Sequence, residues 1–378
     1  MLNKLRQIAS RHLINIPGWR TDRKIVVIES DDWGSIRMAS KEAFNWFLQH
    51  GYDVDTCAYN RNDALESNDD LELLFEVLSS VKDMHGNPAV ITANNIVANP
   101  DFEKIKDSDF KKYFYEPFTK TLNRYPGKDR VIELYNEGMD QNLICPQFHG
   151  REHINVNRWM TELHSGNNKV LRDAFQQDMF TVHKSGDLNC KRDHLDAFGM
   201  DYEKEWVSIK DIIKSGIQLF EDIWGYRSAS FIAPCYVWPV EIESILAENG
   251  VKYIQGTHVQ RVPLPESEPK ISRKYHFMGQ ENCFDQRYLI RNVSFEPAEY
   301  GRKNSVRKAL KEIETAFKFK KPAIISSHRV NYIGSIRPEN RDENLKLLAS
   351  LLKRIVERFR GVEFMSTDQL GELITGGE

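Results

Sequence analysis

The sequence lacks the marks of several protein classes. Its five cysteines stand singly, without a C-x-x-C pair, so nothing indicates a disulfide framework or a thiolate zinc site. The 52 basic and 55 acidic residues nearly balance, and no basic patch supports binding to the phosphates of a nucleic acid. No glycine fingerprint follows a candidate strand, which weakens a dinucleotide-binding fold. We expect reduced thiols and no nucleic-acid partner.

Long apolar runs are also missing from the N-terminal stretch, MLNKLRQIASRHLINIPGW. No part of it is long enough for a signal peptide or a membrane span. Its apolar residues fall on one helical face: Leu2, Leu5, Ile8 and Leu13. We expect a helix over about 1–20 that packs on the domain, with a membrane-surface anchor as the alternative. The expected protein is soluble and cytoplasmic, with no transmembrane segment, and its oligomeric state stays open.

What the sequence does contain is an alternation of short β-branched runs and longer helical patterns. Hydrophobic residues make up 40% of the 378, enough for a sizeable core. The predicted strands cover about 24–30, 88–95, 142–149, 229–236, 252–258, 286–296, 322–328 and 362–366. Helical patterns such as LELLFEVLSSV and ENLKLLASLLKRIVERF lie between several of them. The alternation predicts a parallel sheet, and seven or eight such units favour a (β/α) barrel over an open sheet.

Two stretches fit the repeating unit of strand and helix poorly. One covers about 101–138 and is rich in aromatic residues, and the other covers about 178–204 and is rich in His, Asp and Gly. We interpret both as loop insertions that lie over a site, because long loops in compact domains commonly carry function. The predicted organisation is a single catalytic domain over 1–378.

Polar residues cluster where the predicted strands end: Glu29 to Asp32, Asn94 and Asn95, His149, His258 and His328. In a parallel barrel these ends open on one face, where active sites lie. The densest cluster is I-E-S-D-D-W-G-S, which places three acids within four residues after a strand. Such acids repel one another and resist burial unless a cation or a proton compensates them.

The second informative stretch is Q-F-H-G-R-E-H, in which His149 and His153 are four residues apart. This spacing suits a divalent metal bound through imidazole nitrogens, although chance pairs of this kind are common. Together with Asp31 and Asp32, the pair gives a His-His-Asp ligand set and a spare carboxylate. Three protein ligands leave a position for water, which the metal would acidify and the spare carboxylate would deprotonate.

These two stretches resemble the polysaccharide deacetylase family, also called the NodB-homology carbohydrate esterases. The first family motif, T-F-D-D-G, stands here as E-S-D-D-W-G from Glu29 onward, and H-x-x-x-H follows on a later strand. The resemblance implies a distorted (β/α) barrel and the metal-dependent removal of N- or O-acetyl groups from sugars. It makes Asp31 the catalytic base and gives the metal three ligands: Asp32, His149 and His153.

Later motifs extend the resemblance over roughly residues 20–370, as in a divergent member. I-A-P-C-Y from Ile232 is similar to the family's Arg-Pro-Pro-Tyr turn, and S-S-H resembles its Leu-x-His, which makes His328 the general acid. Ile232 stands where the family has the arginine that orients the base; Arg227 or Arg151 could replace it. The fourth motif, Asp-x-x-Asp-Trp, which tunes the acid, has no visible counterpart.

Six further residues are candidates for contacts with substrate: Trp33, Asn94, Arg151, Pro234, Tyr236 and His258. Aromatic faces such as those of Trp33 and Tyr236 stack on a pyranose ring, with core packing as an equal rival. Asn94 would contact substrate at the mouth of the barrel. Glu29 is either a partner of the site or part of a salt bridge elsewhere.

The leading hypothesis is a metal-dependent hydrolase that deacetylates a sugar or a sugar-bearing intermediate. One divalent ion is expected, zinc first, although cobalt, nickel, iron and manganese accept the same ligands. Two alternatives stay open. One is a glycosidase of the related barrel type with Asp31 as nucleophile. The other is a non-catalytic carbohydrate-binding barrel, suggested by the missing arginine and the missing fourth motif.

Overall fold

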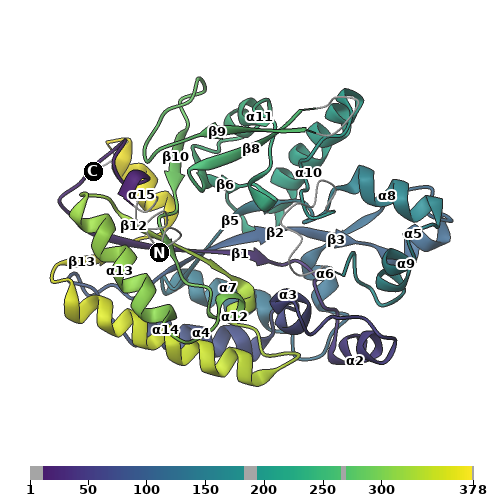
Figure 1. Cartoon of the computed structure of the whole chain (residues 1–378), viewed down its shortest axis with the longest axis horizontal. Coiled ribbons are helices and arrows are strands. Elements are labelled where there is room, and N and C mark those ends of the chain that lie inside the picture. The colour runs from purple at the N-terminus through teal and green to yellow at the C-terminus, as the bar shows by residue number, and fades with distance from the viewer. Residues whose placement is uncertain (1–11, 183–193, 265–269, 377–378) are drawn as a thin grey trace, which may run out of the picture.

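The computed structural model describes residues 12–182, 194–264 and 270–376 (Figure 1). Its main sheet contains the strands β1 (Lys24–Trp33), β2 (Ile91–Ile96), β5 (Ile144–Gly150), β6 (Ser230–Ile232), β7 (Tyr253–Gly256), β10 (Arg287–Ile290), β11 (Val293–Ser294), β12 (Ala323–His328) and β13 (Val362–Phe364). Two antiparallel hairpins stand apart from it: β3 (Ala98–Pro100) with β4 (Tyr115–Pro117), and β8 (Val259–Leu264) with β9 (Lys270–Tyr275).

Helices follow most of the strands along the chain. The α-helices are α2 (Lys41–Gln49), α3 (Ala58–Asn62), α4 (Asn68–Ser79), α5 (Phe102–Asp107), α6 (Phe118–Leu122), α7 (Val131–Asp140), α8 (Val156–Ser165), α9 (Lys169–Gln176), α10 (Trp206–Trp224), α11 (Ile242–Glu248), α12 (Pro297–Tyr300), α13 (Ser305–Lys318), α14 (Pro338–Arg358) and α15 (Thr367–Ile374). Short 3-10 helices are η1 (Glu203–Glu205), η2 (Pro234–Tyr236) and η3 (Arg329–Asn331).

The eight strands of the main order run parallel to their neighbours, in the sequence β10-β7-β6-β5-β2-β1-β12-β11. The two ends of this order, β10 and β11, are separated in the chain only by Arg291 and Asn292. The amide of Arg291 donates to Gly256 O in β7, and the amide of Asn292 donates to Ile324 O in β12. One continuous segment therefore joins both edges of the sheet. The predicted distorted (β/α) barrel with seven or eight parallel strands is confirmed.

The core lies between the sheet and its helices. β1 reads as an unbroken apolar run because both of its faces are covered, and its first apolar residues are at most 1% exposed: Ile25, Val26, Val27 and Ile28. Helix α14 packs against both α4 and α13 along one side of the barrel (Figure 1). The apolar stripe of α14, including Leu345, Leu348 and Leu352, is buried there.

Each of the eight predicted strand segments contains a strand, with shifted bounds. The segment predicted over 229–236 ends as a strand at Ile232, because Pro234 begins a 3-10 turn. The segment over 286–296 is divided at Arg291. Neither antiparallel hairpin was expected.

The predicted terminal helix and insertions fall partly outside the described residues. Of the helix expected over about 1–20, residues 1–11 are not described, and the remainder is helical only through Leu13. The stretch 101–138 holds α5, β4, α6 and the start of α7, whereas 183–193 of the second stretch is not described. Their role over a site stays a prediction. Within the described part of the chain, no helix has the length and hydropathy of a membrane span.

Candidate metal centre and catalytic site

The candidate site lies at the carboxyl ends of β1, β5 and β12. In a regular strand Asp31 and Asp32 would point to opposite faces of the sheet. The register of β1 against β2 shifts between Ser30 and Trp33, and Asp32 has a φ of 75°, which is uncommon outside glycine. This bulge lets both carboxylates reach the same mouth of the barrel, where Asp31 faces β12 and Asp32 faces β5.

Three buried side chains converge in that mouth. Asp32 Oδ1 lies 3.4 Å from His149 Nε2 and 3.2 Å from His153 Nε2. His149 and Asp32 come from the ends of two strands, and His153 comes from the loop that follows β5. His149 Nδ1 lies 2.9 Å from Ile232 O. A carbonyl accepts only from N–H, so this contact requires a proton on Nδ1 and leaves Nε2 facing Asp32.

The three side chains fit a divalent metal ion. Nε2 of His149 is buried without a hydrogen-bond partner, and one ligand atom of each residue lies within 4.8 Å of the others. A tetrahedral zinc with ligand distances of about 2.0–2.1 Å separates its ligand atoms by about 3.3–3.4 Å. The observed contacts of 3.2 and 3.4 Å match that spacing. Among the described residues, this is the one group of three or more such side chains close enough to hold a metal.

Asp31 is held by Arg291 and Asn94. Arg291 donates from Nη1 to Oδ2 at 2.7 Å and from Nη2 to Oδ1 at 2.6 Å, while Asn94 Nδ2 donates to Oδ1 at 2.7 Å. Burial disfavours the charged carboxylate, but the guanidinium outweighs burial and lowers the pKa of Asp31 to about 2. Asp31 is therefore ionised at any physiological pH.

The same guanidinium compensates Glu29. Its Nε donates to Glu29 Oε2 at 2.6 Å, and Thr367 Oγ1 donates to Oε1 at 2.9 Å. Burial still raises the pKa of Glu29, against the opposing charge of Arg291. Two of the three closely spaced acids thus share one arginine, and Asp32 faces the two imidazoles.

His328 lies beside Asp31 on the neighbouring strand, because the two residues are register partners in the parallel pairing of β1 with β12. Its Nε2 lies 3.7 Å from Asp31 Oδ2, and its Nδ1 lies 2.7 Å from Glu296 Oε1. Asn331 Nδ2 donates to the other oxygen of Glu296 at 2.7 Å and so holds that carboxylate in place. Burial opposes the imidazolium charge, yet Glu296 and the aspartates raise the pKa of His328 well above its ordinary value.

Two other predicted residues, Trp33 and Asn94, are fully buried below the mouth. Trp33 is fully buried, donates to Ser30 Oγ and packs edge-on against Tyr135, so it belongs to the core. Asn94 is also fully buried, and its amide protons go to Asp31 and Gln255, so it supports Asp31 from below and does not reach the surface.

The two arginines proposed to orient the base do not contact Asp31. Arg151 pairs with Glu152 at 2.6 Å and stacks over the ring of Tyr115 at 4.0 Å. Arg227 is exposed and pairs with Glu221 at 3.2 Å. The arginine that contacts Asp31 is Arg291 instead.

The turn after β6 reaches the site through Tyr236. Its hydroxyl accepts from Arg291 Nη1 at 3.2 Å, and its φ of 58° belongs to a tight turn that the buried Pro234 begins. His258 is half-buried beside Tyr275, and no contact with Asp31, Asp32 or either metal-facing histidine is present among its described neighbours.

Arg291 and Glu296 were missed by the sequence reasoning, although both lie in the segment predicted as a strand over 286–296. A signal for each was present. Arg291 directly follows the apolar residues Y-L-I, and Glu296 is the charged residue at the carboxyl end of the segment. The strand-end argument that selected His149 and His328 applies equally to Glu296.

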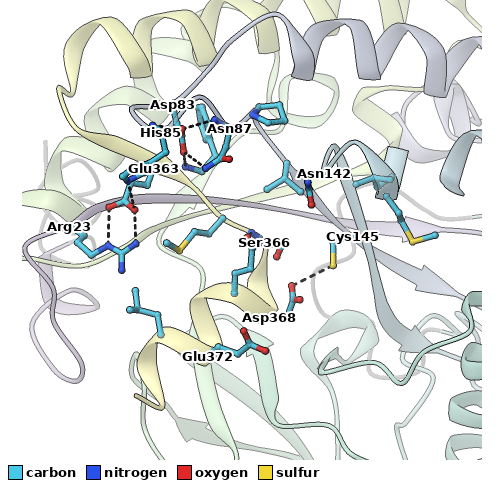
Figure 2. A pocket seen from close by; sticks show the side chains of 18 of the residues that line it. Arg23, Asp83, His85, Asn87, Asn142, Cys145, Glu363, Ser366, Asp368 and Glu372 are labelled. Carbon is cyan, nitrogen blue, oxygen red and sulfur yellow. Dashed lines mark hydrogen bonds and ion pairs between the residues drawn. The ribbon is translucent and has the colours of Figure 1, made fainter. Parts of the chain in front are cut away.

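A separate cavity of about 720 Å³ lies at the opposite, amino ends of the strands (Figure 2). Several of its charged lining residues have partners within the protein: Arg23 pairs with Glu363 at 2.5 Å, and Asp83 accepts from the backbone amides of His85 and Asn87. None of the residues predicted for catalysis or metal binding lines it. The carboxyl ends of the strands therefore remain the candidate site.

No protein-family model matches the chain, and no curated protein matches it. Solved structures are similar at low identity. A candidate glycoside hydrolase/deacetylase from Parabacteroides distasonis is 8% identical, with a TM-score of 0.49 over 94% of this chain and 72% of that one. A candidate polysaccharide deacetylase from Pseudomonas aeruginosa PAO1 is also 8% identical, with a TM-score of 0.44 over 93% and 91%.

A 4-alpha-glucanotransferase from Thermococcus litoralis is 9% identical, with a TM-score of 0.43. The match covers 92% of this chain but spans only 40% of the length of that protein. Because every one of these likenesses is this remote, the chemistry of the site has to be argued from the residues of this chain.

Proposed function

We propose that the protein is a metal-dependent hydrolase that removes N- or O-acetyl groups from a sugar or a sugar-bearing intermediate. The observation that carries the proposal is the convergence of two imidazole nitrogens, from His149 and His153, on one oxygen of Asp32. Zinc is the expected ion, and cobalt, nickel, iron or manganese would accept the same ligands. An ion bound there would acidify a water molecule and polarise the acyl carbonyl.

Asp31 has the properties of the base. It stays ionised, it lies beside Asp32 in the chain, and Arg291 and Asn94 fix its orientation. In the proposed reaction Asp31 accepts a proton from the attacking water through a free lone pair of Oδ2. Arg291 acts through Asp31 as a positioning residue, because both of its Nη atoms hold the carboxylate.

His328 has the properties of the acid. The contact with Glu296 favours its protonated form. The Nε2 atom of His328 lies 3.7 Å from Asp31 Oδ2, so the acid and the base are neighbours. His328 would donate that proton to the leaving nitrogen or oxygen as the acyl C–N or C–O bond breaks. The products are acetate and the free amine or alcohol. Transfer of the proton from Asp31 to His328 then returns both residues to their starting protonation states.

The two alternatives receive less support. A glycosidase with Asp31 as nucleophile would leave the convergence of His149 and His153 on Asp32 without a role. The non-catalytic hypothesis was motivated by a missing arginine and a missing partner of the acid. Arg291 and Glu296 supply both contacts from positions outside the family motifs.

The test is acetate release by zinc-loaded protein from a panel of N- and O-acetylated sugars. We expect release by the wild type and a loss of about 10²-fold or more in Asp31→Asn, since general base catalysis contributes about 10²–10⁴-fold. Zinc content by elemental analysis should stay near one ion in Asp31→Asn and fall in Asp32→Ala. The proposal is overturned if no sugar yields acetate and Asp32→Ala holds as much zinc as the wild type.

A further inference from the structure

Arg37 is an almost buried arginine whose guanidinium makes no hydrogen bond to the described residues. Its side chain is 8% exposed, and Nη1 is enclosed without a partner. The ion-pair contact that it does have, from Nε to Asp63 Oδ2, is 4.0 Å long, beyond hydrogen-bond range. Arginine carries five N–H donors and stays charged in proteins, so leaving these donors unused inside the fold costs free energy.

Asp63, the acid that approaches Arg37, is already paired with another arginine. Arg329 donates from Nε to Asp63 Oδ1 at 3.0 Å and from Nη1 to Glu66 Oε2 at 2.8 Å. Asp63 Oδ2 has no hydrogen-bond partner of its own, so the fold keeps Arg37 and Asp63 apart although both would gain from pairing. If the role of Arg37 were to form a structural ion pair with Asp63, we would expect Nε and Oδ2 to be within hydrogen-bond distance.

Two aromatic rings hold the guanidinium at the mouth of the barrel. Its Cζ lies 5.3 Å from the ring centre of Tyr59 and 5.7 Å from that of Phe180. The ring of Tyr59 lies in turn 5.6 Å from the ring of His328, the proposed acid. Arg37 also stands five residues after Asp32, on the loop that leaves β1. Contacts with rings restrict the plane of the guanidinium but satisfy none of its donors.

We propose that Arg37 binds an anionic group of the substrate, a carboxylate or a phosphate ester, beside the acyl group that is removed. The inference rests on the proposed function for the reaction and adds the class of substrate: an acylated sugar that carries a negative charge. A planar guanidinium binds either group by donating two parallel hydrogen bonds to it. A neutral sugar leaves those donors unpaired, and a buried site with unpaired donors discriminates strongly against it.

The first measurement is binding without turnover. Zinc-loaded protein is titrated calorimetrically with glucose, glucuronate and glucose 6-phosphate, none of which carries an acyl group. We expect the wild type to bind at least one of the anionic sugars tenfold or more tightly than glucose. Arg37→Met should lose this preference, and the matched control Arg227→Met, which changes an exposed arginine, should keep it. The two anionic sugars distinguish a carboxylate from a phosphate ester.

Anion binding to the metal itself is separated by the same variants, because it would persist in Arg37→Met. If Arg37→Met does not fold by circular dichroism, Arg37→Lys is used, which keeps a charge but cannot form two parallel hydrogen bonds. The inference is overturned if the wild type binds all three sugars equally, or if the variant of Arg37 keeps the preference.

The second measurement is acetate release from N-acetylglucosamine, its 6-phosphate and the corresponding uronic acid. Arg37→Met should lower kcat/KM for the charged substrates by 30-fold or more and change that for the neutral one by less than threefold. Equal release from all three by wild type and variant overturns the inference but leaves the proposed function standing. Absence of release together with an Arg37-dependent preference in binding overturns the function and leaves the anion site standing.

Discussion

At the scale of single residues, the candidate site depends on one guanidinium. Arg291 is 2% exposed at its side chain and donates to Asp31 and to Glu29. Two carboxylates 260 positions or more from it in the chain would otherwise be buried without compensation. Removing one charged member of such a buried group lowers the stability of the fold by more than the intact group contributes to it. The reason is that the remaining charge is left in the protein interior without a partner.

Arg291→Lys should lower kcat by about 10²-fold, because an ammonium cannot hold both oxygens of Asp31 and Glu29 at once and a displaced base costs about that much. KM should change by less than threefold, since Arg291 is not expected to touch the substrate. Steady-state kinetics on an acetylated sugar measure both constants. Arg227→Lys serves as the control at an exposed position. A variant of Arg291 that keeps half of the wild-type kcat would contradict the positioning role.

Glu296→Gln should move the alkaline fall of kcat/KM to lower pH. His328 must keep its proton to act as the acid, and burial alone would lower its pKa; the carboxylate of Glu296 provides the largest opposing contribution. A glutamine removes that charge but retains the shape, so the proton of His328 is lost earlier as the pH rises. The pH profile of the variant, compared with that of Glu339→Gln on the surface of α14, measures the shift. An unchanged alkaline limb would rule out the pairing as the source of acidity.

At the scale of elements, the bulge that ends β1 sets the direction of the two aspartates. It is followed at once by Gly34, which has a φ of 78° and a backbone amide bonded to Glu66 at 3.0 Å. A Cβ at this position would lie 2.2 Å from Ile96 O, a backbone atom of β2. The close approach of β1 and β2 at this point leaves no space for a side chain.

Gly34→Ala should therefore lower the free energy of unfolding by about 3 kcal/mol or more, since a left-handed residue costs about 1–2 kcal/mol and overpacking adds about 1–3. Gly51→Ala is the matched control, because Gly51 has a φ of 79° but nothing within 4 Å of its added Cβ. That variant should lose only about 1–2 kcal/mol. Urea unfolding measures both. Equal losses in the two variants would show that conformation alone, and not the contact with Ile96, sets the cost.

The elements of the barrel were largely predictable, whereas the contact of Arg291 with Asp31 and that of Glu296 with His328 were not. Buried strands such as β1 and β12 are marked by local runs of β-branched residues, which the sequence displays directly. The hairpin of β3 and β4 was not predicted because these strands have only three residues each, too few for any periodicity. The roles of Arg291 and Glu296 were not predicted, because the local sequence does not indicate which distant carboxylate or imidazole a charged residue contacts in the fold.

At the scale of the whole molecule, the segment that runs from β10 through Arg291 to β11 joins the two edges of the sheet. The candidate metal ligands join β1 to β5 on the other side of the mouth. A ligand held there would connect strands that are otherwise linked through β2. Binding to the native state alone stabilises the whole fold by linkage.

Zinc should therefore raise the midpoint of thermal unfolding, by the equivalent of about 2.7 kcal/mol when free zinc is 100 times its dissociation constant. Chelation should reverse the shift. His153→Ala should lose most of it, because that imidazole lies 3.2 Å from Asp32 Oδ1. His258→Ala, a histidine outside the group, should retain it. Differential scanning calorimetry with and without zinc makes the measurement, and an equal shift in both variants would place the bound zinc elsewhere.

The position of Arg291 late in the chain also determines when the site can form during synthesis. Asp31 leaves the ribosome 260 residues before the arginine that compensates it. At about 5–20 residues per second, that interval lasts roughly 13–50 s. For that time the nascent chain contains β1 without its neighbour β12 and without Arg291. Expression conditions that slow translation before codon 291 should lengthen this vulnerable interval and lower the yield of folded protein.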